Sequence, residues 1–210
     1  MKCTIDRTAL KAVSRFSCTK DIRYYLVGVY VESSPLETRL IATDGHALIV
    51  HRAAAKGDNV GSWSGIIPLD TIKTLMKIKG MKNWTMEITD AGNGEYRIQY
   101  GSEAVIFRPI DGKFPDYRRV VPPTVNNETA HYDPELLMRV KNAAEDFGIK
   151  NAAFSLAHNG KGTGVCHVTA DCMALVMPMV SDPVDMLAVK WAAEPLPMPS
   201  APDNVVPIAA

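Results

Sequence analysis

The sequence predicts an α+β fold in which largely antiparallel sheets are backed by helices on one face. The main observation is one pattern that occurs three times along the chain: a short strand, an amphipathic helix, and then strands separated by turn residues. The composition agrees, because 210 residues with 47% apolar and 22% charged residues are typical of a soluble globular protein of one or two domains. No apolar run approaches the roughly 20 residues of a membrane helix, so we expect a cytoplasmic protein with no membrane partner.

The first unit begins with a strand over residues 2–5 and continues into a helix over residues 7–17. The helix is predicted from an apolar stripe at every third position, formed by Leu10, Val13 and Phe16. Residues 24–32 and 39–52 are rich in Tyr, Val and Ile and are predicted to be strands on either side of a Ser-Ser-Pro turn.

The second unit runs from residue 64 to residue 109 and opens with a strand over residues 65–68. Asp70 is predicted to be the N-cap of the helix that follows. This helix is expected to bury one face, formed by Ile72, Leu75, Met76 and Ile78. Turn signals at residues 91–94 and 101–102 divide the next strands into hairpins.

The third unit starts near residue 129. Asp133 as N-cap and Pro134 at the first helical position predict a helix that runs to Asp146 and ends before Gly148. Its apolar face comprises Leu136, Leu137, Val140, Ala144 and Phe147. Strands are expected over residues 152–157 and 165–180, and six prolines after residue 180 predict an irregular tail with one helical turn over residues 185–191.

Charge is unevenly distributed although the chain as a whole is neutral. Residues 1–124 hold 18 Lys or Arg against 13 Asp or Glu, a net charge of +5, whereas residues 125–210 hold 5 against 10, a net charge of −5. The first two helices carry rows of cations at helical spacing, formed by Arg7, Lys11 and Arg15, and by Lys73 and Lys77, with Lys79 and Lys82 beyond. The third helix is mixed, because Arg139 and Lys141 are offset by Glu135, Glu145 and Asp146. Such rows suit contact with a phosphate backbone, although solvated helix faces explain the same pattern.

Side chains that could ligate a metal or catalyse a reaction are present, but their spacing suits neither role. His46 and His51 lie five residues apart on a predicted strand and therefore face opposite sides, and only Asp44 accompanies them. Cys166, His167, Asp171 and Cys172 match no zinc spacing, and four cysteines without a CxxC pair are expected to be reduced. We therefore expect no catalytic residue, no metal and no cofactor, and an enzyme that uses Asp44 and His46 is the weakest alternative.

Two stretches are more specific than composition or periodicity. The first joins Asp-Ile-Arg-Tyr-Tyr-Leu-Val-Gly at residues 21–28 to Ala-Thr-Asp-Gly-His at residues 42–46. The second is Asp-Gly-Lys-Phe-Pro-Asp-Tyr-Arg-Arg-Val-Val-Pro at residues 111–122. Both closely resemble the middle domain of the bacterial DNA polymerase III beta subunit, the replicative sliding clamp. The resemblance covers about residues 4–122, resumes at residues 132–144 and ends at Val-Met-Pro-Met, residues 176–179.

This resemblance implies the DNA-clamp fold, which has repeated strand-helix-strand units with antiparallel sheets outside and helices inside. It divides the chain into a complete clamp domain at residues 1–124, half a clamp domain at residues 125–180 and a Pro-rich C-terminal tail at residues 181–210. Relative to the family, the chain lacks the first domain and the first half of the third. A family ring contains a dozen units, so we expect a homo-oligomer, a dimer or a tetramer, that pairs through the exposed strand edge of the third unit. The alternative is that the tail covers this edge or lies in the protein's own pocket.

The resemblance also implies a groove for short peptides of replication proteins, including DNA polymerase and the clamp loader. The matching residues are Leu26, Thr43, Gly45, His46, Leu48, Pro115, Arg119, Val120, Leu175, Met177, Pro178 and Met179. Ala47 departs from the family, which usually has Arg there. An alternative interpretation is that these residues only pack the junction between the two clamp segments.

The expected function is that of a sliding-clamp-like DNA replication accessory protein. It would bind clamp-binding peptides in the groove and would bind duplex DNA non-specifically through cationic helix residues, Arg7, Lys11, Arg15, Lys73 and Lys77. The alternative function is a non-encircling interaction module that competes for these peptides without binding DNA.

Overall fold

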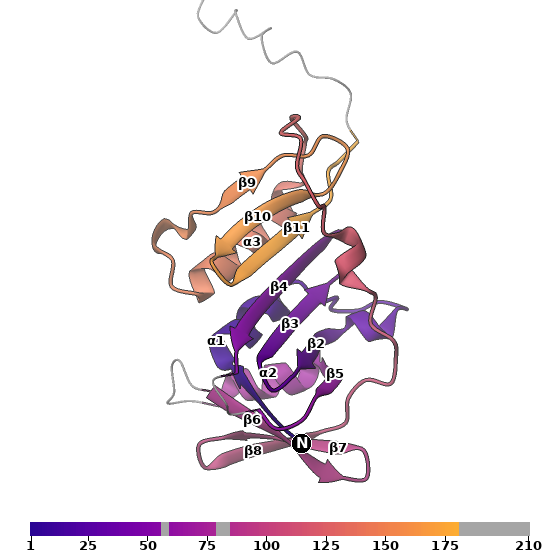
Figure 1. Ribbon diagram of the computed structural model, residues 1–210, viewed down its shortest axis with the longest axis vertical. Coiled ribbons are helices and arrows are strands. Elements are labelled where there is room, and N and C mark those ends of the chain that lie inside the picture. The colour runs from indigo at the N-terminus through magenta and orange to yellow at the C-terminus, as the bar shows by residue number, and fades with distance from the viewer. Residues whose placement is uncertain (56–58, 79–84, 181–210) are drawn as a thin grey trace, which may run out of the picture. The chain divides into compact units, whose positions relative to one another are not determined.

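Two antiparallel sheets and three α-helices packed against them make up the computed structural model, which describes residues 1–55, 59–78 and 85–180 (Figure 1). The predicted tail with its helical turn, as well as Lys79 and Lys82, lies outside the described residues. No helix within these described ranges is long and apolar enough to cross a membrane.

The first repeat follows the predicted order of elements, with three differences. Its elements are β1 (Lys2–Asp6), α1 (Arg7–Ser14), β2 (Gly28–Ser33), β3 (Glu37–Thr43) and β4 (Ala47–Ala54). The single strand predicted over residues 39–52 is a hairpin of two strands, which a turn divides at residues 44–46. Helix α1 is three residues shorter than predicted, because the backbone N–H groups of Arg15 and Phe16 turn to carbonyls three residues back, and the helix tightens at its end. Residues 24–26 form a 3-10 turn, η1 (Tyr24–Leu26), instead of the start of a strand.

The second repeat comprises β5 (Trp63–Pro68), α2 (Leu69–Lys77), β6 (Thr85–Gly92), β7 (Glu95–Tyr100) and β8 (Glu103–Phe107). The prediction that Asp70 caps α2 was wrong, because the helix begins at Leu69 and Pro68 occupies the N-cap without a side-chain hydrogen bond. Tertiary structure supplies the missing acceptor, since the Leu69 N–H donates to the carbonyl of Val27 at 3.1 Å. Asp70 lies in the first turn and pairs with Lys73.

The third repeat comprises α3 (Pro134–Asp146), β9 (Ser155–Ala157), β10 (Gly164–Thr169) and β11 (Cys172–Val176). Helix α3 has the predicted bounds, and the carboxylate of its N-cap Asp133 accepts the N–H of Glu135 at 2.8 Å. The predicted strand over residues 165–180 is a hairpin of β10 and β11, because a tight turn divides it at residues 170–171.

The first two repeats exchange strands. In the four-stranded sheet, of order β1-β6-β7-β8, the first strand of the chain pairs with the second repeat. In the seven-stranded sheet, of order β5-β2-β3-β4-β11-β10-β9, strand β5 of the second repeat pairs with β2 of the first repeat. The third repeat extends this sheet because β11 pairs with β4 along five residues of each strand. Residues 1–180 form one compact unit, and the domain boundary at residue 124 stays a prediction.

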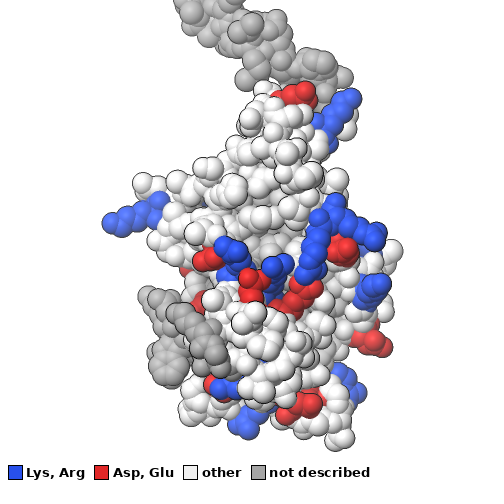
Figure 2. All heavy atoms as spheres, in the orientation of Figure 1, with Lys and Arg blue, Asp and Glu red and all other residues white. Residues whose placement is uncertain are grey.

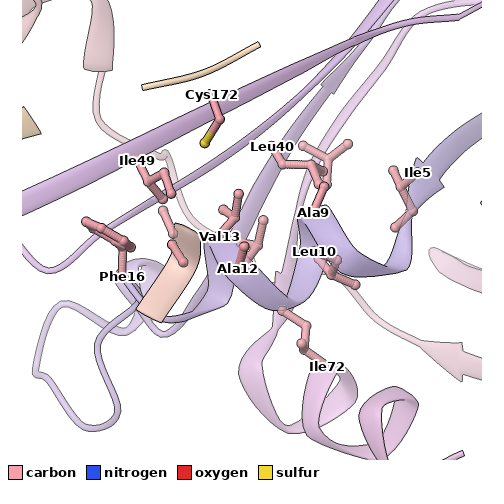
Figure 3. Packing of buried hydrophobic residues seen from close by; sticks show 14 of the residues in the cluster. Ile5, Ala9, Leu10, Ala12, Val13, Phe16, Leu40, Ile49, Ile72 and Cys172 are labelled. Atoms are coloured by element: carbon pink, nitrogen blue, oxygen red, sulfur yellow. The ribbon is translucent and has the colours of Figure 1, made fainter. Parts of the chain in front are cut away.

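One core lies between the helices and the sheets. The side chains of Leu10 and Val13 on α1 and of Phe16, just beyond its end, are fully buried, which confirms the predicted stripe. In Figure 3 the α1 side chains point toward Leu40 and Ile49 of the seven-stranded sheet and toward Ile72 of α2. Helix α3 packs beside α1 and covers β10 and β11. The helices therefore lie on one face of the seven-stranded sheet. The linker between β8 and α3, residues 108–133, packs Phe114 and Tyr117 on the other face, called the outer face below.

Candidate peptide pocket and helix surface

A cavity of about 210 Å³ opens on the outer face of the seven-stranded sheet, where β4 meets β11. Nine of the twelve residues predicted for the groove line it, namely Leu26, Thr43, Gly45, His46, Leu48, Pro115, Val120, Leu175 and Met177. Leu48 and Leu175 form its base, because they are direct partners across the β4–β11 ladder and both are buried. Val120 and Met177 are each 50% exposed and lie at its mouth. The cavity thus has an apolar base and two adaptable apolar side chains at its entrance.

Three predicted residues do not line the cavity. Arg119 has an 84% exposed side chain that points to Asp116 at 3.3 Å. Pro178 and Met179 lie beyond the cavity, where the Met179 N–H donates to the carbonyl of His131 at 2.8 Å. The chain turns away from β4 after Met177, and the side chains that follow leave the cavity with it.

The structure adds lining residues that the sequence did not indicate, namely Arg23, Tyr25, Phe114, Asp116, Tyr117 and Thr163. Ala47, the groove position at which the resemblance already marked a departure, lines the cavity as well. Phe114, Asp116 and Tyr117 belong to the same linker stretch as Pro115, and Tyr117 opens a 3-10 turn, η2 (Tyr117–Val120). Phe114 and Tyr117 are buried and pack on Leu48 and Leu175 in one apolar cluster. The aromatic residues Phe114 and Tyr117 beside Pro115 were the signal from which the sequence could have predicted that this linker packs on the sheet.

The turn between β3 and β4 forms one wall of the cavity and is held by its own side chains. Thr43 donates its hydroxyl to the carbonyl of Ala47 at 2.7 Å and accepts the N–H of Gly45 at 3.0 Å. Asp44 accepts the N–H groups of His46 at 2.9 Å and Ala47 at 3.0 Å. Gly45 has a φ of +97°, a backbone conformation that residues with a Cβ atom rarely adopt, and this explains why glycine occupies this point of the wall.

Asp44 also joins the first repeat to the third, because its carboxylate accepts a hydrogen bond from the guanidinium of Arg139 on α3. Burial opposes ionisation of Asp44, but the hydrogen bonds from the Ala47 N–H, Arg139 and the His46 N–H outweigh burial. They hold the pKa of Asp44 below its usual range. The carboxyl group of Asp44 in this wall is therefore ionised at neutral pH.

The opposite wall, formed by the linker, is held to β2 and β3. The Tyr117 hydroxyl donates to the Glu32 carboxylate at 3.0 Å and accepts from Arg39 at 3.2 Å. Arg118 binds both oxygens of Glu32, at 2.6 and 3.2 Å, and its guanidinium lies over the Tyr117 ring. A two-pronged Arg–carboxylate contact is geometrically specific, so this network fixes the linker at the cavity.

The predicted cationic rows are only partly available to a ligand. Lys11 Nζ lies 2.7 Å from Asp146, and the Arg15 guanidinium donates to the same carboxylate. Arg7 is half-buried, where it donates to the Met76 carbonyl at 2.9 Å and lies over the Tyr100 ring. Arg7 is therefore less accessible than the row at helical spacing suggests, because the end of α2 packs across the start of α1. Lys73 pairs with Asp70, and Lys77 is exposed with no partner among the described residues.

The outer face of the sheet carries mixed charge. Figure 2, in the orientation of Figure 1, shows Lys and Arg side chains beside Asp and Glu side chains over the middle of this face, with no continuous band of one sign. Arg39 with Glu37, Arg52 with Asp171 and Arg118 with Glu32 account for such pairs. The outer face thus offers no broad basic surface to a polyanion.

The residues singled out for metal or acid–base chemistry stay apart. No group of three or more His, Cys, Asp or Glu that could hold a metal occurs within the described part of the chain. His46 lies in the β3–β4 turn, whereas His51 stacks on Phe147 under the sheet, and burial lowers the pKa of His51. Burial raises the pKa of Cys166 and that of Cys172 to about 12, so neither thiol is a thiolate at neutral pH.

The chain is similar in sequence to proteins of one known family. The sequence model of the DNA polymerase III beta subunit, central domain, matches residues 1–116. The chain belongs to the DNA polymerase III beta subunit family. The beta sliding clamp of Proteus mirabilis is 33% identical over 123 residues, which are 57% of this chain and 33% of that protein. The clamp of Escherichia coli strain K12 is 37% identical over 112 residues, 49% of this chain and 28% of that protein.

Solved structures of beta subunits share the fold. The beta subunit of Thermotoga maritima superposes with a TM-score of 0.67 at 15% identity, over 87% of this chain and 66% of that one. The sliding clamp of Pseudomonas aeruginosa bound to griselimycin superposes with a TM-score of 0.63 at 19% identity, over 86% and 66%. The predicted DNA-clamp fold is thereby confirmed. The chain spans about a third of the length of the two curated sliding clamps above, 33% and 28%.

Proposed function

We propose that this protein is a sliding-clamp-like accessory of DNA replication that binds short apolar peptides of replication proteins between β4 and β11. DNA polymerase and clamp-loader peptides are the proposed partners, and duplex DNA is the proposed ligand of the helices. The observation that carries the proposal is the cavity itself, whose apolar base comes from two strands distant in the sequence, with Leu48 on β4 and Leu175 on β11. The protein acts as a binding protein without a catalytic step.

The size and lining of the cavity support a peptide ligand. A volume of about 210 Å³ is below the roughly 300–1,000 Å³ of sites that enclose a drug-sized ligand, and it suits one or two apolar side chains. Each buried anchor contributes roughly 1.5–3 kcal/mol, and ordering the peptide offsets part of this gain. We therefore expect affinities of about micromolar strength, with Met177 accommodating side chains of different shape.

Duplex DNA is expected to contact the helices more weakly than the cationic rows alone would predict. Lys73 and Lys77 on α2 are exposed, whereas Lys11 and Arg15 share the carboxylate of Asp146. Contacts from a few lysines to phosphates carry little sequence information and weaken as salt rises. Because Asp146 neutralises Lys11 and Arg15, a second candidate function is an interaction module that competes for clamp-binding peptides without binding DNA.

Charge reversal on α2 separates these two candidates. Lys73→Glu combined with Lys77→Glu is expected to weaken binding of a 30-base-pair duplex at least tenfold at low salt, because two phosphate contacts become repulsive. Peptide affinity is expected to stay unchanged, since both lysines lie outside the cavity lining. Fluorescence anisotropy of labelled duplex measures the effect.

The matched control is Lys113→Glu with Lys161→Glu, which makes the same charge change at exposed positions outside the helices. An equal loss in the control would show that only net charge matters. If the unaltered protein binds peptide but no duplex at low salt, the DNA part of the proposal is wrong and the competing module is favoured.

Assembly stays a prediction. Among the described strands, β9 pairs with β10 on one side only, and β8 pairs with β7 on one side only. A strand edge of this kind can pair with a second copy, and a homo-oligomer through β9 is the expectation.

A further inference from the structure

We infer that Arg139 is a positioning residue for the peptide pocket: it holds the β3–β4 turn in its binding conformation from the other segment of the chain, without touching the peptide. This inference rests on the proposed function of the pocket. Arg139 lies on α3 and is absent from the cavity lining.

Arg139 contacts the β3–β4 turn at Asp44. The Arg139 guanidinium donates to one oxygen of Asp44, while the other oxygen accepts the N–H groups of His46 and Ala47. His46 and Ala47 both line the cavity. Asp44 is 14% exposed and Arg139 is 33% exposed, so the contact is partly shielded from water. A change at Arg139 therefore reaches the cavity wall through a single carboxylate.

The β3–β4 turn is also hydrogen-bonded to the mouth of the pocket. The carbonyl of His46 accepts the Met177 N–H at 2.9 Å, so a shift of the turn also shifts the methionine at the mouth. On its other side the turn is held by Arg23, which donates to the Asp44 carbonyl at 3.0 Å and pairs with Asp21. Arg23 and Arg139 thus hold Asp44 from opposite segments, and loss of Arg139 leaves the turn fixed on one side only.

A positioning role of Arg139 differs from a contribution to the stability of the whole fold. The third repeat stays docked through other contacts, namely the β4–β11 ladder and the pairing of Asp146 with Lys11 and Arg15. Removing Arg139 breaks none of these. The expected effect is local to the turn, and it should appear in peptide binding and in the turn amides before it appears in unfolding.

The test uses the full chain and a labelled six-residue peptide that carries Leu and Phe as apolar anchors. Arg139→Met is expected to weaken peptide binding about fivefold to tenfold, whereas Arg139→Lys, which keeps a charged donor, is expected to stay within about twofold of the unaltered protein. Lys141→Met is the matched control, because Lys141 is on the same helix but pairs with Glu145 of that helix. This control is expected to bind normally.

Amide hydrogen exchange supplies the second readout. In Arg139→Met the N–H groups of His46 and Ala47 are expected to exchange faster while the amides of the β4–β11 ladder keep their protection. Peptide affinity equal to that of the unaltered protein, or uniform loss of protection along the ladder, would overturn the inference. If the unaltered protein does not bind the peptide at all, the proposed function fails first, and the titration of that protein alone reveals it.

Discussion

Truncating Leu48 and Met177 together to alanine is expected to weaken peptide binding about 100-fold. Leu48 lies at the base of the cavity, and Met177 lies at its mouth. Each truncation removes apolar contact with the peptide, and two losses of roughly 1–2 kcal/mol combine to this factor. Isothermal titration with the Leu- and Phe-containing peptide measures the loss.

Leu48→Ala and Met177→Ala are expected to differ in their effect on folding stability. Leu48 is buried in the cluster with Leu175 and Tyr117, so Leu48→Ala also costs about 2–4 kcal/mol of folding free energy. Met177 is 50% exposed, and Met177→Ala alone is expected to weaken binding about tenfold with little loss of stability. Met179→Ala is its matched control, because Met179 is 53% exposed, lies two residues further on and does not line the cavity. Equal losses from Met177→Ala and Met179→Ala would contradict the assignment of the pocket.

Asp146→Asn is expected to lower stability and to strengthen DNA binding at the same time. The Asp146 side chain is 5% exposed and holds both Lys11 and Arg15 at the α1–α3 contact. Neutralising it removes two partly exposed ion pairs, and we expect a loss of about 1–2 kcal/mol in the free energy of unfolding by urea. The two released cations become available to phosphates, so the slope of log affinity against log salt should steepen by up to about 1.8.

Acid should reproduce the stability part of this effect. Burial raises the pKa of Asp146, but the hydrogen bonds from Arg15 and Lys11 outweigh burial and hold that pKa below the usual value of 3.8. A lowered pKa means that the contribution to stability is complete above the pKa of the unfolded chain and is lost as the pH falls through the pKa of the folded chain. The stability difference between the unaltered protein and Asp146→Asn should therefore shrink as the pH falls below about 4. A constant difference down to pH 2, or weaker duplex binding by Asp146→Asn, would contradict this role.

Local signals predicted the helices well where the sequence itself supplies the caps. Asp133 and Pro134 fix the start of α3, and the observed bounds agree. At α2 the same reasoning failed, because the Leu69 N–H finds its acceptor on Val27, more than forty residues earlier in the chain. Periodicity likewise placed Arg7 on the polar side of α1 but could not show that the carbonyl of Met76 would lie there.

Strand pairing was the least predictable part of the fold. The exchange of β1 and β5 between the first two repeats, and the joining of β4 to β11, are contacts between segments far apart in the sequence. No local pattern specifies such partners. The pocket was anticipated because the resemblance pointed to both of its sides, whereas Asp146 and Arg139 were seen only as charges that offset each other on the third helix.

Methyl NMR of the full chain during titration with the Leu- and Phe-containing peptide tests the central claim most directly. The proposed pocket predicts saturable shifts of the methyl signals of Leu48, Val120, Leu175 and Met177, all of which line the cavity. The signals of Met138, which is 53% exposed on α3 away from the cavity, should stay in place. Shifts confined to other methyl groups, or no saturable shift at millimolar peptide, would contradict the account.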